Sequence, residues 1–195
     1  MAQSIYIPLF PLNLLPLPGE LVPLHIFEPR YKQLFREAEA ADFEFGIYFT
    51  HPSNNAGVGA VMQLESILKR YPEGELDVVV KCRDIFTMEK QYRNYVGKLY
   101  PAAHIYRWHM QAGSYCNDDL LNLFAEYVSL RKYKSIYDDV NLFTIAHELN
   151  LELAERYKLL MLDEKKRAPY LLTRVQYHVK LLRREAQSKN VFHLN

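Results

Sequence analysis

The spacing of apolar residues changes near residue 115, and this change limits the possible folds more than any other feature. Before that point, apolar residues recur at every second position in short runs, as in the run that starts at Ile5, which is typical of β-strands. Beyond it they recur at helical intervals, as in the stretch that starts at Leu120. Strands followed by helices predict an α+β fold. We expect a β-barrel subdomain over residues 1–115 and a helical bundle over residues 116–195.

Prolines and glycines set the limits of the expected strands. Pro23 lies inside an apolar run and lacks an N–H, which predicts an edge strand or a bulge. Pro29 suits the first position of a helix, where the missing donor costs nothing. Gly74 can close a hairpin turn that starts at Tyr71. The expected elements are strands over residues 5–10, 21–27, 43–49, 58–69, 76–82 and around Ile105, an irregular loop forced by Pro11, Pro16 and Pro18, and a helix from Pro29 through Ala38. Many short strands with frequent turns favour a small barrel or two packed sheets.

The second part of the chain predicts a small helical bundle. Asn117 and Asp118 can cap a helix that runs to about Lys132. Three more helices are expected over residues 142–149, over residues 151–162 and from about Pro169 onward. These helices are apolar enough to pack on one another as a small bundle.

Charge, cysteine spacing and the lengths of the apolar stretches predict a protein that has no membrane anchor and no strongly charged surface for nucleic acid. The net charge is +1 over 195 residues, so no global field favours nucleic acid or membrane. Cys82 and Cys116 form no CxxC pair, which indicates free thiols in a reducing compartment. The start of the chain has no signal-peptide pattern, and no apolar stretch is long enough to span a bilayer. We therefore expect a cytoplasmic protein that does not bind membranes.

The motifs of common enzymes and metal sites are absent from the sequence. There is no phosphate-binding GxxxxGK[ST] loop and no GxSxG elbow. His147 begins an HExxH-like pattern, but Leu151 replaces the second ligand. His104 and His109 are five apart in an extended segment and so face opposite ways. Cys116 precedes a helix start, which can activate a thiol, although an incidental loop cysteine is the commoner case. We expect no catalytic residue, no metal and no cofactor.

The last helix is basic and leaves RNA binding open as an alternative. A cationic helix can contact phosphates, but a solvated helix face is the more frequent explanation. Its charged residues are Lys165, Lys166, Arg167, Arg174, Lys180, Arg183, Arg184 and Lys189, against Asp163, Glu164 and Glu185.

The opening of the chain resembles the amino-terminal domain of Lon proteases. The similarity lies in a proline-punctuated strand over residues 7–12, a loop that ends in Pro-Gly at Gly19, and the motif PLHIFEPRY over residues 23–31. It continues through Gly59, Ile67, residues 71–74, residues 78–83 and the helical stretch of residues 151–185. The family usually has glycine where this chain has Cys82, which concerns local backbone only.

The resemblance implies both a fold and a function. It implies a PUA-like β-pseudo-barrel followed by a C-terminal helical bundle, and recognition of exposed, partly unfolded protein segments. The chain ends at Asn195, before the ATPase and Ser–Lys protease domains of Lon would begin. We therefore expect a non-catalytic binding module whose partners are flexible protein segments, with a separate protease or ATPase as a further candidate partner.

The same motif supplies the candidate binding residues. They are His25, Phe27, Glu28, Arg30 and Tyr31. An architectural role is the alternative for most of them, since Pro29 sets a helix start, Tyr31 joins its apolar stripe and Arg30 can pair with Glu28. Recognition could use a hydrophobic groove between barrel and bundle, or strand addition at the edge marked by Pro23.

Overall fold

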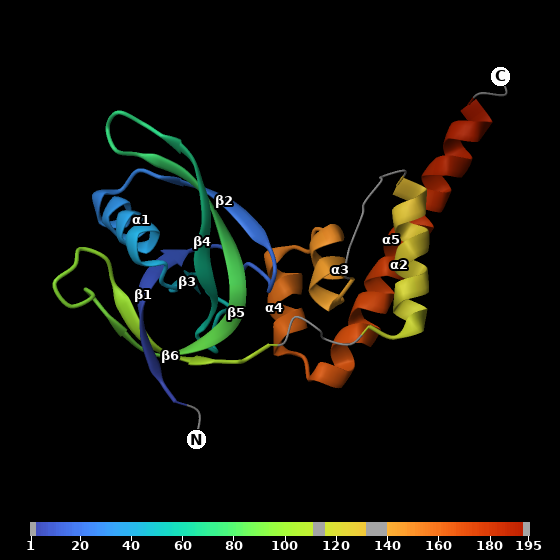
Figure 1. Ribbon diagram of the computed structural model, residues 1–195. Helices are drawn as coiled ribbons and strands as arrows, with labels where there is room; N and C mark the ends of the chain where they lie inside the picture. The colour runs from blue at the N-terminus through green and yellow to red at the C-terminus, as the bar shows by residue number, and fades with distance from the viewer. Residues whose placement is uncertain (1–2, 111–115, 132–139, 193–195) are drawn as a thin grey trace. The chain divides into compact units, whose positions relative to one another are not determined.

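The computed structural model describes residues 3–110, 116–131 and 140–192. The chain divides into two compact units, Met1–Gln111 and Ala112–Asn195, drawn in Figure 1. The boundary expected between residues 115 and 116 adjoins residues 111–115, which lie outside the described part of the chain.

The first unit is a ring of strands with one helix. Its elements are β1 (Ile5–Leu12), β2 (Leu21–Ile26), α1 (Pro29–Ala41), β3 (Phe45–Phe49), β4 (Val58–Arg70), β5 (Leu76–Tyr92) and β6 (Ala102–Arg107). The strand order is β2-β5-β4-β3-β1-β6, and β5 also pairs with β6. This second pairing closes five strands into a ring and leaves β2 outside it, as an edge strand, as Pro23 predicted. The predicted α+β fold is confirmed, and the closed ring agrees with the predicted pseudo-barrel.

The length of β5 makes the closure possible. Its first residues pair with β2, its last residues pair with β6, and β4 runs antiparallel beside it as far as Thr87. The β4–β5 register shifts at three places and the β5–β6 register at one. Such bulges bend strands and increase their twist, which lets one long strand serve both sides of the ring.

Strand β1 continues through Pro11, where the sequence predicted an irregular loop. Residues 5–8 pair antiparallel with β6, whereas residues 9–12 pair parallel with β3. Each half of β1 therefore has a strand partner mainly on one side. A proline is tolerated where its missing N–H would face the unpaired side.

Helix α1 packs its apolar face on the ring, as the sequence predicted. Its buried residues are Tyr31, Leu34, Phe35 and Ala38. The ring of Phe35 lies 6.0 Å from that of Phe10 and 5.2 Å from that of Phe45. Pro29 occupies the helix start, and the helix ends at the left-handed Asp42.

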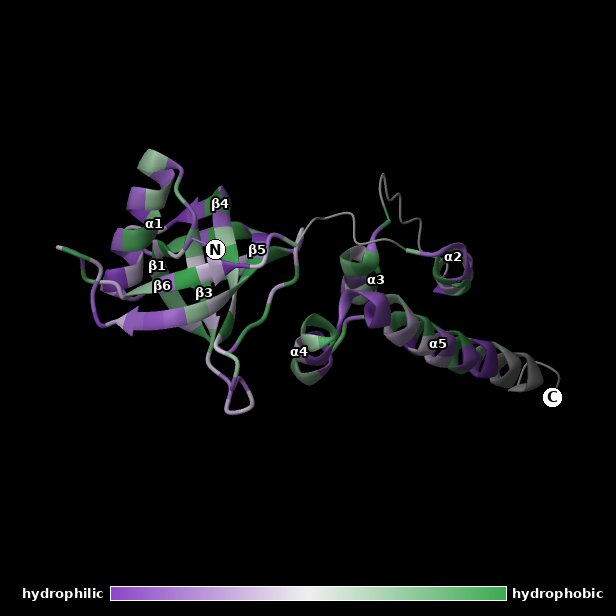
Figure 2. Ribbon diagram, turned by 90° about the horizontal axis from the view of Figure 1, so that it is seen from below, coloured by the Kyte–Doolittle hydropathy of each residue, from purple (hydrophilic) through white to green (hydrophobic). Residues whose placement is uncertain are grey.

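The second unit is helical, as predicted. It contains α2 (Asp118–Arg131), α3 (Leu142–Glu148), α4 (Leu153–Met161) and α5 (Glu164–Phe192). Asn117 caps α2 by accepting from the Leu120 N–H at 3.1 Å. Hydrophobic and hydrophilic residues alternate along α5 in Figure 2, and its apolar stripe includes the buried Leu171, Val175 and Val179.

Helix α5 begins at Glu164, five residues before the expected start at Pro169. A proline inside a helix removes one hydrogen bond to the preceding turn and usually kinks the chain. Here the turn before it is held by other contacts: the Lys166 N–H donates to the Asp163 carbonyl, and Arg167 donates to the carbonyls of Leu160 and Leu162.

Candidate functional site

His25 lies in a polar cluster beside the hairpin between β4 and β5. Its Nδ1 is 2.7 Å from Asp77 Oδ1, and its Nε2 is 3.7 Å from a carboxylate oxygen of Glu75. The Tyr71 hydroxyl donates to the other Asp77 oxygen at 2.7 Å. The hydrogen bond from His25, and next that from Tyr71, lowers the pKa of the Asp77 carboxyl below its ordinary value. The cluster ties β2 to the hairpin and holds the His25 ring in place.

Odd-numbered residues of β2, together with Phe27 just after it, form an exposed and largely apolar surface. Leu21 is 53% exposed and Phe27 is 59% exposed, and Pro23 is exposed between them. Val79, opposite Pro23 on β5, is half-buried on the same side of the sheet. The His25 ring stacks beside Phe27, with 6.1 Å between centroids. We call these five residues the β2 face.

The three other candidate residues lie where β2 leads into α1. Arg30 forms an ion pair with Glu28 at 2.8 Å, and its guanidinium lies 4.5 Å above the centre of the Tyr31 ring. Tyr31 is only 3% exposed and packs on Phe10 with 4.1 Å between centroids. Burial raises the pKa of the Tyr31 hydroxyl. Glu28 and Arg30 are thus accessible to a ligand, whereas Tyr31 supports them from the core.

The outer edge of β2 has backbone groups that face away from β5. Cys82 N–H donates to the Glu20 carbonyl at 2.9 Å, and the register places Leu24 opposite Val78. In an antiparallel pair the hydrogen-bonded positions alternate. Even-numbered residues of β2 therefore bond to β5, and odd-numbered residues direct their backbone groups outward. At Pro23 the outward position has a carbonyl but no N–H.

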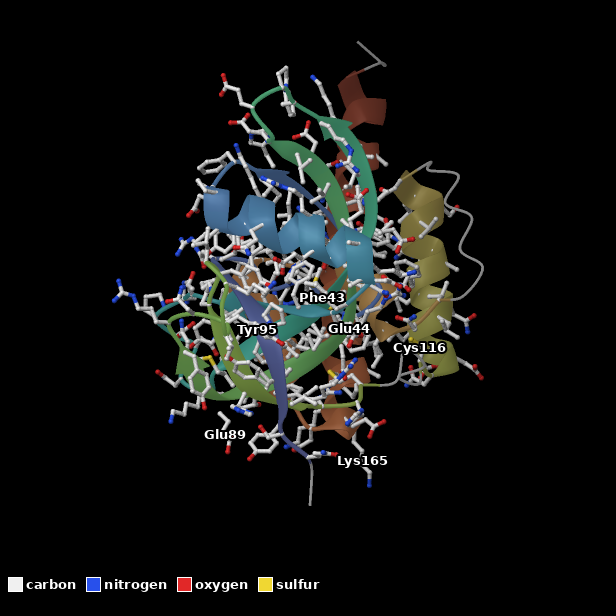
Figure 3. All side chains as sticks on the ribbon, turned by 60° about the vertical axis from the view of Figure 1, so that its left-hand side comes forward. Phe43, Glu44, Glu89, Tyr95, Cys116 and Lys165 are labelled. Carbon is white, nitrogen blue, oxygen red and sulfur yellow. The ribbon has the colours of Figure 1, made fainter. Side chains whose placement is uncertain are left out.

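Two cavities flank α1, and sequence reasoning missed both because their walls come from separate segments. One, of about 650 Å³, lies between the end of α1 and the outer half of β4. The other, of about 530 Å³, is lined by β1, α1, the residues before β3, the loop before β6 and Arg107 at the end of β6. We call the second cavity the α1–β1 groove. Figure 3 labels Phe43, Glu44 and Tyr95 from its wall.

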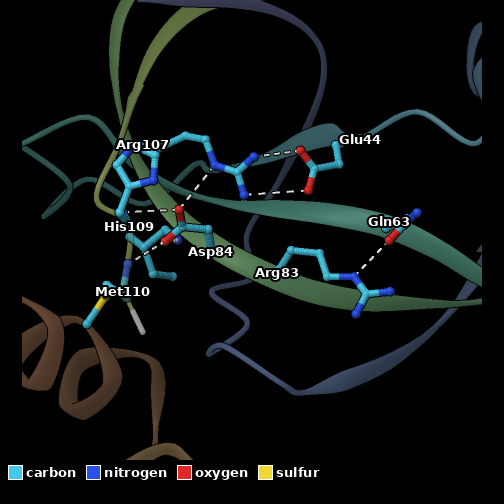
Figure 4. Close-up of polar contacts among 8 residues, drawn as sticks. Glu44, Gln63, Arg83, Asp84, Arg107, His109 and Met110 are labelled. Carbon is cyan, nitrogen blue, oxygen red and sulfur yellow. Dashed lines mark hydrogen bonds and ion pairs between the residues drawn. The ribbon is translucent and has the colours of Figure 1, made fainter. Parts of the chain in front are cut away.

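A buried carboxylate organises the end of the first unit. Asp84 is 3% exposed and accepts hydrogen bonds from the backbone N–H groups of Ile85, His109 and Met110 at 2.8–3.1 Å. It also accepts from Arg107 Nε at 3.1 Å, and Arg107 pairs with Glu44 (Figure 4). This network fixes the turn after β6, where His109 adopts the left-handed conformation with φ 52°. His109, which follows five positions after His104 in the sequence, therefore contributes its backbone N–H to a structural turn.

The remaining chemical candidates lie apart from one another. Cys82 is buried, and burial raises the pKa of its thiol. His104 Nδ1 lies 3.3 Å from the Ser4 hydroxyl. No group of three or more histidine, cysteine, aspartate or glutamate residues suited to a metal occurs within the described ranges. Within the same ranges, no helix has the length and apolar character needed to cross a membrane.

The closed ring with its covering helix is consistent with the PUA-like pseudo-barrel that the resemblance implied, and a helical unit follows it along the chain. The family described as the ATP-dependent protease La (LON) substrate-binding domain matches residues 6–188. This chain belongs to that family. None of the curated protein sequences matches it significantly.

Solved structures show the same fold. A Lon N-terminal domain protein from Xanthomonas campestris superposes with a TM-score of 0.67 at 21% identity, covering 87% of this chain and 98% of that one. The N-terminal domain of Mycobacterium avium complex Lon protease gives a TM-score of 0.63 at 16% identity, covering 88% and 98%.

Proposed function

We propose that this chain binds exposed, flexible segments of other proteins and carries out no chemical step itself. The β2 face carries the proposal, because Leu21 and Phe27 are both more than half exposed. Large apolar side chains gathered on a folded surface typically mark a contact with another molecule. The substrate-binding description of the family supports the same role.

The edge beside the β2 face suits an extended segment. Backbone groups of Leu21, Pro23 and His25 face outward, so a client chain could add as a further strand. Main-chain hydrogen bonds give such pairing its affinity without demanding one sequence, and side chains of the client would lie against Phe27. The missing N–H of Pro23 keeps the pairing short, which favours reversible capture.

The partners follow from this mode of binding. Clients would be unfolded or flexible protein segments, and a separate ATPase or protease could receive them. We expect the protein to act in the cytoplasm, since neither Cys82 nor Cys116 is in a disulfide. His25, Phe27, Glu28 and Arg30 would contact the client, and Tyr31 would position Arg30 from below.

RNA binding by α5 is the weaker candidate, because several of its cations already have partners. Lys166 pairs with Asp163 at 2.9 Å, and Arg174 and Arg183 each pair with a glutamate of the same unit. Arg167 donates to two main-chain carbonyls. A phosphate would have to compete with these contacts.

Anisotropy measurements with a fluorescent, permanently unfolded protein test the proposal. We expect Leu21→Ser with Phe27→Ser to weaken its binding by at least tenfold, because losing contact with two apolar side chains costs about 1.5–3 kcal/mol and about 1.4 kcal/mol corresponds to tenfold in affinity. Val96→Ser is the matched control, since Val96 is 81% exposed but lies in the loop before β6. Its affinity should equal that of the parent chain.

A single-stranded RNA probe separates the alternatives. Equal affinity of the double variant and the parent for the unfolded protein would contradict a role for the β2 face. Tight RNA binding that weakens steeply with salt would instead support the basic helix.

A further inference from the structure

The α1–β1 groove exists because β3 is shorter than its neighbour β1. Pairing between β1 and β3 begins at Leu9 and Gly46, so residues 5–8 of β1 have no strand on that side. Residues 42–44 pass this gap outside any strand, and Glu37 of α1 also lines it. The result is a cavity of about 530 Å³ that uses no residue of the β2 face.

Aromatic rings form much of the groove wall. Tyr6 and Tyr95 stack with 4.9 Å between centroids and an interplanar angle of 27°. Phe43 lines the groove from the residues before β3, and all three rings are only partly buried. Phe43 and Tyr95 come from separate segments, the residues before β3 and the loop before β6, and both are labelled in Figure 3. Such rings offer π-faces to an incoming side chain.

The charges at the groove do not balance. Lys98 pairs with Glu37 at 2.9 Å, which accounts for one cation and one carboxylate. Arg107, which lines the groove, lies between two carboxylates: it contacts both oxygens of Glu44, at 2.7 and 3.5 Å, and its Nε lies 3.1 Å from the buried Asp84, which is behind the groove and does not line it. Three carboxylates thus share two cations. The excess is negative, and Glu44 is its accessible member, because the Asp84 side chain is 4% exposed and that of Glu44 is 35% exposed.

We propose that the α1–β1 groove accepts an arginine side chain of a bound protein segment. The apolar wall suits the aliphatic stem, the rings of Tyr95 and Phe43 suit the planar guanidinium, and Glu44 supplies the unbalanced carboxylate. A guanidinium stacks on aromatic faces and pairs with carboxylates in a forked geometry, whereas an ammonium is a more strongly hydrated point charge. The inference rests on the proposed function only in assigning the arginine to a client segment.

The decisive probe is a small molecule, N-acetyl-arginine-N-methylamide, titrated into the full chain and followed by amide NMR shifts. The citrulline analogue has the same shape without the charge. We expect shifts at Phe43, Glu44 and Tyr95, with the citrulline analogue about tenfold weaker because the charge interaction is lost. Glu44→Gln and Tyr95→Leu should each weaken the arginine probe several-fold, with unfolding midpoints measured to verify that both variants are folded.

Two controls make the outcome decisive. Glu65→Gln removes a half-exposed carboxylate that lines the other cavity, and it should leave arginine binding unchanged. The variant with Leu21→Ser and Phe27→Ser should also bind the arginine probe normally, so failure of the proposed function would not imitate failure of the groove. Equal binding of arginine and citrulline, or shifts confined to other residues, would overturn the proposal.

Discussion

At Gly59, the packing of the neighbouring residues leaves no room for a side chain. A Cβ atom there would lie 2.2 Å from Phe86 Cζ and 2.6 Å from the Ile47 carbonyl oxygen, and Phe86 is fully buried. We expect Gly59→Ala to lower the free energy of unfolding by about 1–3 kcal/mol, the usual cost of overpacking. Urea denaturation measures the loss. Gly46→Ala should cost less, because the nearest atoms, at 2.9–3.1 Å, all belong to side chains that can shift.

Single residues of the candidate site were only partly predictable from the sequence. The motif pointed to His25 and Phe27, which lie together on the β2 face, and the helical spacing correctly placed Tyr31 in the core. Asp77 was not predicted, because its contact with His25 spans 52 positions and depends on the register of β2 against β5. The walls of the α1–β1 groove come from five separate segments, and no local pattern links them.

At the scale of the elements, we predict that Pro23 in β2 limits strand pairing between copies of the chain. Pro23 leaves one outward position of the edge without a donor, and prolines at such places discourage pairing between copies. Pro23→Val restores the N–H and adds a residue that favours strands, so we expect stronger self-association. Sedimentation velocity over a range of concentrations measures it. Leu24→Val is the control, because the Leu24 N–H already faces β5, and identical behaviour of the two variants would contradict this role.

Element types were more predictable than element limits. The strands and the buried face of α1 were predicted correctly, because the spacing of apolar residues indicates which side of an element is buried. The limits failed at Pro11 and Pro169, where a proline suggested a break that the structure does not have. In β1 the change of strand partner accommodates the proline, and at α5 the carbonyl contacts of Arg167 hold the preceding turns. The first compensation is tertiary, and the second depends on side-chain contacts five and seven positions back along the chain. Neither is visible in the spacing of apolar residues.

At the scale of the whole molecule, the closure of the strand ring was the feature that local sequence could not specify. It requires β5 to pair with β2, β4 and β6 along different parts of its length. The apolar cluster of Ile7, Leu9, Val61, Phe86, Ala103 and Ile105 then joins strands from both ends of the unit. Because the ring and this cluster are complete within Met1–Gln111, the first unit contains its own core.

This completeness predicts that residues 1–110 fold without the helical unit. We expect dispersed amide NMR signals and a cooperative urea transition, since a domain with its own closed core meets the condition for independent folding. A fragment of residues 1–100 is the matched control: it lacks β6, so the ring opens and both β1 and β5 lose a partner. It should remain largely unfolded. If residues 1–110 instead bind a hydrophobic dye and unfold without a cooperative transition, the barrel depends on the helical unit for its stability, and binding assays would then require the full chain.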